Sequence, residues 1–208
     1  MAQAVRAVWT EGEVRLDGQR LSGHAPEAVA RKGIARTFQI PEICHELSVY
    51  DNVLVGAHRH VHGGLFGQAL GIGRAASSMA EARELARREL VSTGLWDMHD
   101  APAHVLPLGK VRLLEIARAL ASSPKLLLLD EAASGLNSQE AMELARLVRT
   151  LPSRGVSVVL IEHNVRFVMD LADTIAVLDY GQLISIGTPD VVRRDERVIA
   201  AYLGKRKK

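Results

Sequence analysis

The 208-residue chain is 48% hydrophobic and 24% charged, a composition that suits one globular domain with room for a subdomain. A formal net charge of +2 and an aromatic content of 4% favour neither a nucleic-acid patch nor a stacking platform for single strands. The single cysteine, Cys44, excludes an internal disulfide, and no apolar run approaches the roughly 18–20 residues that span a bilayer. We therefore expect a cytosolic protein that binds no nucleic acid.

The first elements along the chain are short. Residues 13–21 (EVRLDGQRL) predict a hairpin that turns at Asp17-Gly18, because a tight turn needs positive φ angles. Residues 26–32 predict one or two helical turns, and residues 34–38 (IARTF) predict a short strand.

The middle of the chain has a helical pattern. Ser48 can cap a helix, and residues 77–95 carry apolar side chains at helical spacing. We expect an α/β part, a mostly helical subdomain and a second α/β part, which cover residues 1–47, 48–105 and 106–208.

Helices and strands alternate in the last part of the chain. They are predicted as helix 111–122, strand 126–130, helix 138–150 with Ser138 as its cap, strand 156–162, helix 164–172 and strand 174–179. The strands are almost wholly apolar, which is typical of a parallel sheet that is covered on both faces. The alternation predicts an α/β fold with right-handed crossovers.

Two of these strands end in acidic residues, Asp130-Glu131 and Glu162-His163. Ligands of open α/β sheets bind beyond the carboxyl ends of the strands. An apolar strand that ends in Asp-Glu is the pattern that holds Mg²⁺ and positions water in nucleotide hydrolases, because a hard cation prefers carboxylate oxygen. Taken alone, this motif favours the plainer interpretation of a buried strand that runs into a helix-initiating turn.

Five short motifs follow one another in order along the chain. They are Gln39 after a strand, LPLGK (106–110) at the start of a helix, LLLLDE (126–131), SGLN (134–137) and IEHN (161–164). This order resembles the ATP-binding cassette of ABC transporters, with its glutamine loop, signature loop, Walker B, D-loop and switch histidine. The amino-acid sequence is most similar to the ATPase subunit of bacterial branched-chain amino acid importers in six segments: GIARTFQ (33–39), DNVLVGAHR (51–59), LEIARALA (114–121), LIEHN with FVMDLAD (160–173), VLDYGQLISIGTP (177–189) and VIAAYLG (198–204).

The resemblance implies ATP and Mg²⁺ as cofactors and a role for each matched residue. Asp130 would hold Mg²⁺, Glu131 would be the general base and His163 would contact the γ-phosphate. Gln39 would reach Mg²⁺ or the attacking water and couple the site to the membrane subunits. The signature loop and the D-loop would face the ATP of a second ATPase subunit across a head-to-tail dimer; their residues are Leu106, Pro107, Leu108, Gly109, Lys110 and Asn137.

The resemblance also implies transmembrane permease subunits as partners and a peripheral place on the cytoplasmic face of the inner membrane. The LPLGK segment of this chain departs from the common LSGGQ form of the signature loop. Pro107 stands where that form has serine, and Lys110 stands where it has glutamine.

The phosphate loop G-x-x-x-x-G-K-[ST] does not occur in the 208 residues. The resemblance therefore implies a P-loop NTPase-like three-layer α/β fold, with a parallel sheet and a helical subdomain, that lacks the Walker A strand and helix. The chain would begin about 40 residues late for such a cassette. Strands 156–162 and 174–179 would then lose the strand between them, and we expect a gap, a collapsed pairing or a substituted strand in its place.

Three functions remain open from the sequence. The first is the ATP-binding and ATP-hydrolysing subunit of a bacterial importer for branched-chain amino acids, present as an N-terminally truncated chain. The second is a degenerate cassette remnant that binds no nucleotide and acts only as an interaction module. A DNA-repair or chromosome-structuring ATPase would share the motifs, but it would place a very long coiled coil where this chain has only residues 40–105.

The remaining polar candidates favour plain roles. His58, His60 and His62 alternate along the chain without visible further zinc ligands, so we expect solvated loop histidines. Cys44 has no base partner in the sequence, so we expect a small packing residue.

Overall fold

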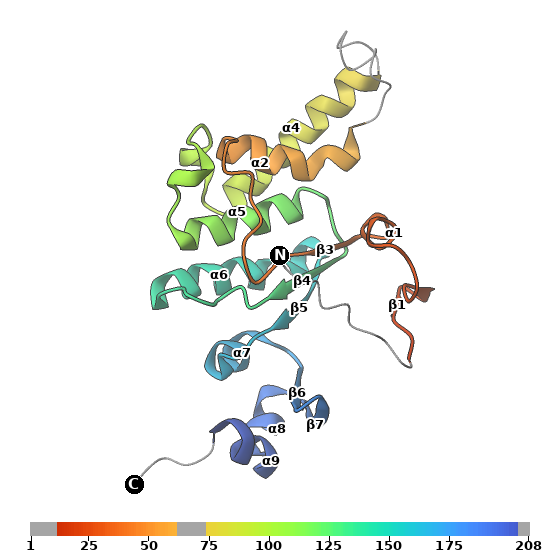
Figure 1. Ribbon diagram of the computed structural model, residues 1–208, viewed down its shortest axis with the longest axis vertical. Coiled ribbons are helices and arrows are strands. Elements are labelled where there is room, and N and C mark those ends of the chain that lie inside the picture. Colours follow the sequence, from red (N-terminus) through yellow and green to blue (C-terminus); the bar gives the residue numbers. More distant parts are fainter. Residues whose placement is uncertain (1–11, 62–73, 204–208) are drawn as a thin grey trace, which may run out of the picture.

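The computed structural model of the chain describes residues 12–61 and 74–203, and most of its helices and strands lie in three groups, with α1 and β1 to one side of them (Figure 1). The helices α2, α4 and α5 lie together at one end, a three-stranded sheet with α6 occupies the middle, and α8 and α9 lie beside a two-stranded sheet at the other end. The α-helices are α1 (Pro26–Arg31), α2 (Val49–Gly56), α4 (Arg74–Ser92), α5 (Leu108–Leu120), α6 (Ser138–Thr150), α7 (Val165–Leu171), α8 (Pro189–Arg194) and α9 (Glu196–Val198). The strands are β1 (Arg15–Leu16), β2 (Gln19–Arg20), β3 (Ile34–Arg36), β4 (Leu126–Asp130), β5 (Ser157–Ile161), β6 (Ile175–Asp179) and β7 (Gln182–Gly187).

Short helical turns connect several of these elements. The 3₁₀ turns cover Ala57–His60, Trp96–Met98, Ala103–Val105 and Pro152–Arg154, and a π-helical turn covers Ile199–Leu203. In the ranges that the structure describes, no helix is long and apolar enough to cross a bilayer.

The central sheet has the order β3-β4-β5, and all its strands are parallel. Its covered face carries Leu127 and Leu129, which belong to a continuous apolar core that extends into α2, α4, α5 and α6. Since one core joins the helices to the sheet, the proposed boundaries between residues 1–47, 48–105 and 106–208 remain predictions.

The opposite face of this sheet is open, which differs from the expected cover on both faces. Val159 and Ile161 of β5 expose 49% and 60% of their surface, whereas Val158 and Leu160 pack against the core. An apolar strand is suited to two covered faces, but exposure depends on what lies against it, and α5 and α6 contribute to the core on the covered face.

Of the three outcomes expected between strands 156–162 and 174–179, the described part of the structure shows the gap. The second of these strands, β6, pairs with β7 in a separate antiparallel sheet, and no described strand lies between β5 and β6. The described part of the chain therefore contains three separate sheets, β1-β2, β3-β4-β5 and β6-β7, and the free edge of β5 lies on the side that faces away from β4.

Local signals placed several elements correctly. The N-terminal hairpin turns at Asp17 and Gly18 with φ angles of 49° and 75°, and Ser48 caps α2 by accepting a hydrogen bond from the Asp51 amide. The helix α2 packs closely on α5, because a Cβ atom on Gly56 would lie only 2.0 Å from the Arg118 carbonyl oxygen. A larger residue at position 56 would push these two helices apart.

The expectation for Cys44 is wrong, because this residue is exposed. Its backbone is the part that is used: the buried Asn52 side chain accepts from the Cys44 amide at 2.8 Å and donates to the Cys44 carbonyl at 2.9 Å. His58 is exposed as expected, but His58 and the half-buried His60 lie in the 3₁₀ turn Ala57–His60 rather than in a loop, and His62 lies outside the described residues. No group of three or more His, Cys, Asp or Glu side chains within residues 12–61 and 74–203 could hold a metal ion.

Candidate functional site

The site begins where β4 ends. Asp130 is the last residue of β4, and Glu131 follows with a φ angle of 48°, in the left-handed region. This conformation breaks the pleat of the strand, although the Glu131 amide still donates to the Ile161 carbonyl at 2.9 Å. The two neighbouring carboxylates therefore point in different directions and meet different partners.

Glu131 brings three of the sequence-predicted residues together. The Gln39 side-chain amide donates to Glu131 Oε2 at 2.8 Å, and His163 Nδ1 lies 3.6 Å from Glu131 Oε1. The exposed fractions are 28% for the Glu131 side chain and 68% for that of His163, so water can reach this carboxylate. A partly exposed carboxylate that is oriented by a fixed amide donor is suited to accept a proton from a bound water molecule.

Asp130 is held by a residue that the sequence analysis missed. Arg36 Nη2 donates to Asp130 Oδ2 at 2.8 Å, and the same guanidinium lies 5.3 Å from the centre of the Phe38 ring. Arg36 stands opposite Leu128 in the β3–β4 register, on the face that Asp130 shares. The signal was therefore the strand order, which a single sequence does not give.

A second acid fixes the turn that follows. Glu162 Oε1 accepts a hydrogen bond from the Ala133 amide at 2.7 Å. This bond joins the end of β5 to the turn after β4, so the segments that carry Glu131 and His163 are held to each other.

The predicted signature residues lie in and before the first turn of α5. Leu106 is buried, Pro107 is the N-cap residue, and the helix starts at Leu108 rather than at 111 as expected. The predicted helix start is three residues late. Pro107 is itself a signal that a helix begins at this point, and residues 108–110 continue directly from it.

This signature segment packs on α6 and on the turn before it. A Cβ atom on Gly109 would lie 2.4 Å from Glu140 Oε1, and one on Gly135 would lie 3.0 Å from Leu108 Cδ2. Lys110 Nζ donates to Glu143 Oε2 at 3.4 Å. In residues 12–61 and 74–203, no hydrogen bond or ion pair joins residues 106–110 to Glu131 or His163.

Asn137 has a local role that corrects the predicted cap. Its side chain accepts from the Gln139 and Glu140 amides, and Glu140 returns a bond to the Asn137 amide, which completes a capping box. Ser138 is therefore the first residue of α6 and not its cap. A role of Asn137 across a dimer interface stays a prediction.

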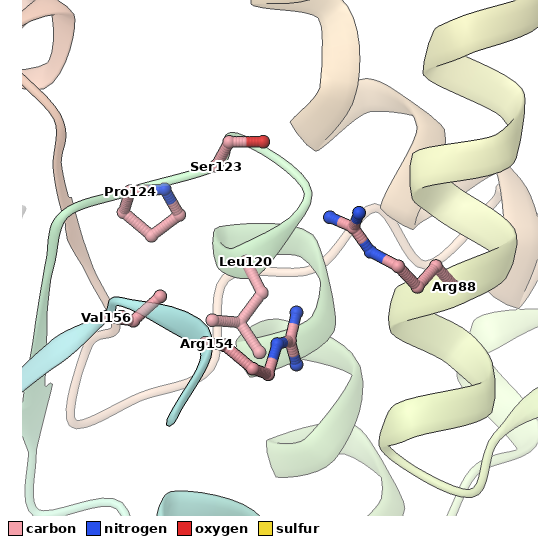
Figure 2. A pocket seen from close by; sticks show the side chains of 6 residues that line it. All are labelled: Arg88, Leu120, Ser123, Pro124, Arg154 and Val156. Carbon is pink, nitrogen blue, oxygen red and sulfur yellow. The ribbon is translucent and has the colours of Figure 1, made fainter. Parts of the chain in front are cut away.

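A pocket lies at the opposite end of the sheet (Figure 2). It has a volume of about 390 Å³ and is lined by Arg88, Leu120, Ser123, Pro124, Arg154 and Val156. Three of these residues come just before β4 and β5, at the amino ends of the strands, where ligands of such sheets do not bind. Beside the pocket, Arg88 and Arg154 compensate the fully buried Glu89 carboxylate at 3.0 Å and 2.5 Å.

The strand ends offer oxygen ligands that suit a partly hydrated Mg²⁺ ion. Asp130 can present Oδ1, because Arg36 occupies Oδ2, and Gln39 can present its amide oxygen. Mg²⁺ commonly takes one or two carboxylates and completes its coordination with water and substrate phosphates. The 208 residues contain no phosphate loop that would cradle those phosphates.

Comparison with known sequences agrees with this arrangement. A family described as "ABC transporter" matches residues 2–134, and one described as "Branched-chain amino acid ATP-binding cassette transporter" matches residues 182–208. The high-affinity branched-chain amino acid transport ATP-binding protein BraF of Pseudomonas aeruginosa is 38% identical over 197 residues, which cover 94% of this chain and 77% of BraF. The corresponding protein LivG of Escherichia coli K12 is 36% identical over the same shares.

Solved structures show the same fold. An ATP-binding cassette of an ABC transporter in its ADP conformation superposes with a TM-score of 0.76 at 27% identity, over 94% of this chain and 78% of that one. A nucleotide-free cassette superposes with a TM-score of 0.75 over the same shares. With a family match over residues 2–134 and relatives above 30% identity along most of its length, the chain belongs to the ATP-binding cassette (ABC) transporter family.

Proposed function

We propose that the chain acts as the ATP-binding and ATP-hydrolysing subunit of a bacterial importer for branched-chain amino acids. The convergence of Gln39 and His163 on the Glu131 carboxylate carries this proposal, because residues that lie far apart in the sequence meet at the carboxyl ends of the strands. The names of the relatives BraF and LivG support the transported class, since both are branched-chain amino acid transport proteins.

Each residue of the site has a distinct role in this proposal. Glu131 accepts the proton of the attacking water, Asp130 holds Mg²⁺ through one oxygen, and His163 contacts the γ-phosphate. Gln39 orients the Glu131 carboxylate through the 2.8 Å bond and reaches Mg²⁺ or water with its amide. The segment 106–110 and Asn137 face the ATP of a second ATPase subunit.

Permease subunits in the membrane are the other proposed partners, with the chain bound peripherally at the cytoplasmic face of the inner membrane. Turnover also needs a phosphate-binding unit, and its motif G-x-x-x-x-G-K-[ST] does not occur in the 208 residues. We propose that the chain is a truncated form of the ATPase subunit and that this unit must be supplied. The alternative is a cassette remnant that binds no nucleotide and serves only as an interaction module.

The experiment compares the 208-residue chain with a version that carries a phosphate-binding segment from a related cassette at its N-terminus. We expect the 208-residue chain to hydrolyse ATP at background rate and the extended version to hydrolyse it faster. Glu131→Gln in the extended version should abolish hydrolysis and trap an ATP-bound dimer, which light scattering would detect. Glu84→Gln, at an exposed position of α4, is the matched control and should leave both properties unchanged.

Each contrary outcome points to a different error. Turnover by the 208-residue chain that disappears in Glu131→Gln would show that phosphates are held in another way. An extended version that binds no ATP would favour the remnant. Uptake of radiolabelled leucine, isoleucine and valine in a strain that lacks this chain would test the transported class, and unchanged uptake would contradict it.

A further inference from the structure

The segment that carries Gln39 leaves the sheet and is held by a helix instead. The last ladder bond is donated by the Thr37 amide to the Leu128 carbonyl at 2.9 Å. The next amide, that of Phe38, donates to Glu115 Oε1 at 2.9 Å. Arg112 then donates to the Phe38 carbonyl at 3.0 Å and to the Gln39 carbonyl at 2.7 Å.

The side chains that hold this segment stand three residues apart on α5, so they lie along one face of the helix. Arg118 extends the row by donating to the Glu42 carbonyl. Arg112 and Glu115 expose only 5% and 3% of their surface. Hydrogen bonds of charged groups are strong when they are shielded from water, and a buried group that loses its partner carries the full desolvation cost.

We propose that Arg112, Glu115 and Arg118 are positioning residues that fix the backbone of residues 38–42 to α5 and thereby hold the Gln39 amide at Glu131. The proposal rests on the function inferred above for Glu131 and adds the residues that determine where its donor stands.

The same helix begins with the signature segment. Leu108, Gly109 and Lys110 form its first turn, and Arg112 stands in the next one. A helix of 13 residues is a stiff rod about 20 Å long. A displacement of its first turn therefore moves residues 38–42, and the 2.8 Å contact between Gln39 and Glu131 changes with it.

This arrangement would couple the two ATP sites of a dimer. If the signature segment of one subunit contacts the ATP of the other, a shift of that segment moves α5, and α5 moves Gln39 relative to Glu131 of its own subunit. The Gln39 side chain is exposed and reaches Glu131 through a single 2.8 Å bond, so the position of its backbone decides whether its amide reaches the carboxylate.

Nuclear magnetic resonance of the ¹⁵N-labelled 208-residue chain tests the proposal without nucleotide. The measurements are the hydrogen-exchange rate of the Phe38 amide and the side-chain NH₂ signals of Gln39. Glu115→Ala should raise the Phe38 exchange rate about tenfold relative to the amides of β4, which report on global stability. Glu115→Gln keeps an acceptor and should leave the rate within about threefold of the wild type.

Arg112 supplies the second pair of variants. Arg112→Ala should move the Gln39 NH₂ signals towards those of a free glutamine, and Arg112→Lys should move them partly, because an ammonium group does not reproduce the planar fork that bridges two carbonyls. Arg146→Ala, at an exposed arginine of α6, should leave both signals unchanged. If an alanine variant does not fold, the conservative pair decides: Arg112→Lys shifts the Gln39 signals and Glu115→Gln does not.

The proposal is overturned if the Phe38 rate rises only in proportion to the rates in β4, or if no Arg112 variant moves the Gln39 signals. Both results are independent of nucleotide binding. Failure of the positioning residues is therefore distinguishable from failure of the ATPase function.

Discussion

Replacement of Arg154 should destabilise the fold strongly for a partly exposed residue, because Arg154 pairs with the buried carboxylate of Glu89. The Glu89 side chain is fully buried, and Arg154 Nη2 donates to its two oxygens at 2.5 Å and 2.7 Å. Arg154 precedes β5 and Glu89 lies in α4, so the bond ties the helices to the sheet. Arg154→Ala removes both bonds and leaves Arg88 at 3.0 Å as the remaining cationic partner.

The expected loss of stability follows from this geometry. Breaking a buried ion pair costs about 3–5 kcal/mol, because one charge is left without its partner. The Arg154 side chain is 27% exposed and Arg88 remains, so we lower the expected cost to about 2–3 kcal/mol. In a chain of this size, such a loss lowers Tm by about 5–10 °C.

Urea unfolding at pH 7, followed by far-UV circular dichroism, measures this loss. Arg146→Ala is the control and should change the free energy of unfolding by less than about 0.5 kcal/mol. A double-mutant cycle with Glu89→Leu should show that Arg154→Ala costs much less once the buried acid is gone. The reasoning fails if Arg154→Ala is as mild as the control, or if its cost is the same with and without Glu89.

The other predictions concern a helix contact, a cap and a buried acid. Gly56→Ala should lower the free energy of unfolding by about 2 kcal/mol or more, because the new Cβ would meet the Arg118 carbonyl at 2.0 Å; a thermal melt equal to that of the exposed control Arg146→Ala would contradict this. Asn137→Ala should cost about 1 kcal/mol through the lost capping box, whereas Asn137→Ser should be nearly neutral in the same urea titration. Burial raises the pKa of the Glu115 carboxyl above its ordinary value of 4.5, although the Phe38 amide and Arg112 act in the opposite direction. The folded state then binds this proton more tightly than the unfolded state, so the associated stability is present below pH 4.5 and is lost as the pH rises through the raised value. Glu115→Gln should therefore gain stability relative to the wild type as the pH is raised from about 4 to 7, and parallel stability curves would show that the shift is absent.

Local patterns predicted most of the fold because the signals were redundant. Helix 138–150 has an amphipathic face, a polar cap and an acid in its first turn, and its bounds were confirmed. The cap itself was assigned to Ser138, although Glu140 lies three residues after Asn137 and so marks Asn137 as the capping-box residue. Asn137 and Ser138 are both good cap residues, and only the position of Glu140 shows which of them is the cap.

The candidate site at the strand ends was predictable from the sequence, but the residues that hold it in place were not. Asp130, Glu131 and His163 follow strands whose carboxyl ends meet at one edge, so their neighbourhood follows from the alternation of elements. Arg36 and the positioning residues of α5 act through contacts between residues that are 70 or more positions apart in the sequence. Arg36 and Asp130, for example, are 94 positions apart. Such contacts depend on strand order and helix rotation, which a local pattern does not contain.

The left-handed backbone at Glu131 sets two kinds of selection against each other. A residue with a Cβ atom strains this conformation by roughly 1 kcal/mol, and glycine would relieve that strain. A library of variants sorted only for heat resistance should therefore enrich glycine at position 131, while a library of the extended version sorted for ATP turnover should keep glutamate. A redesign that optimises thermostability alone would thus erase the proposed general base.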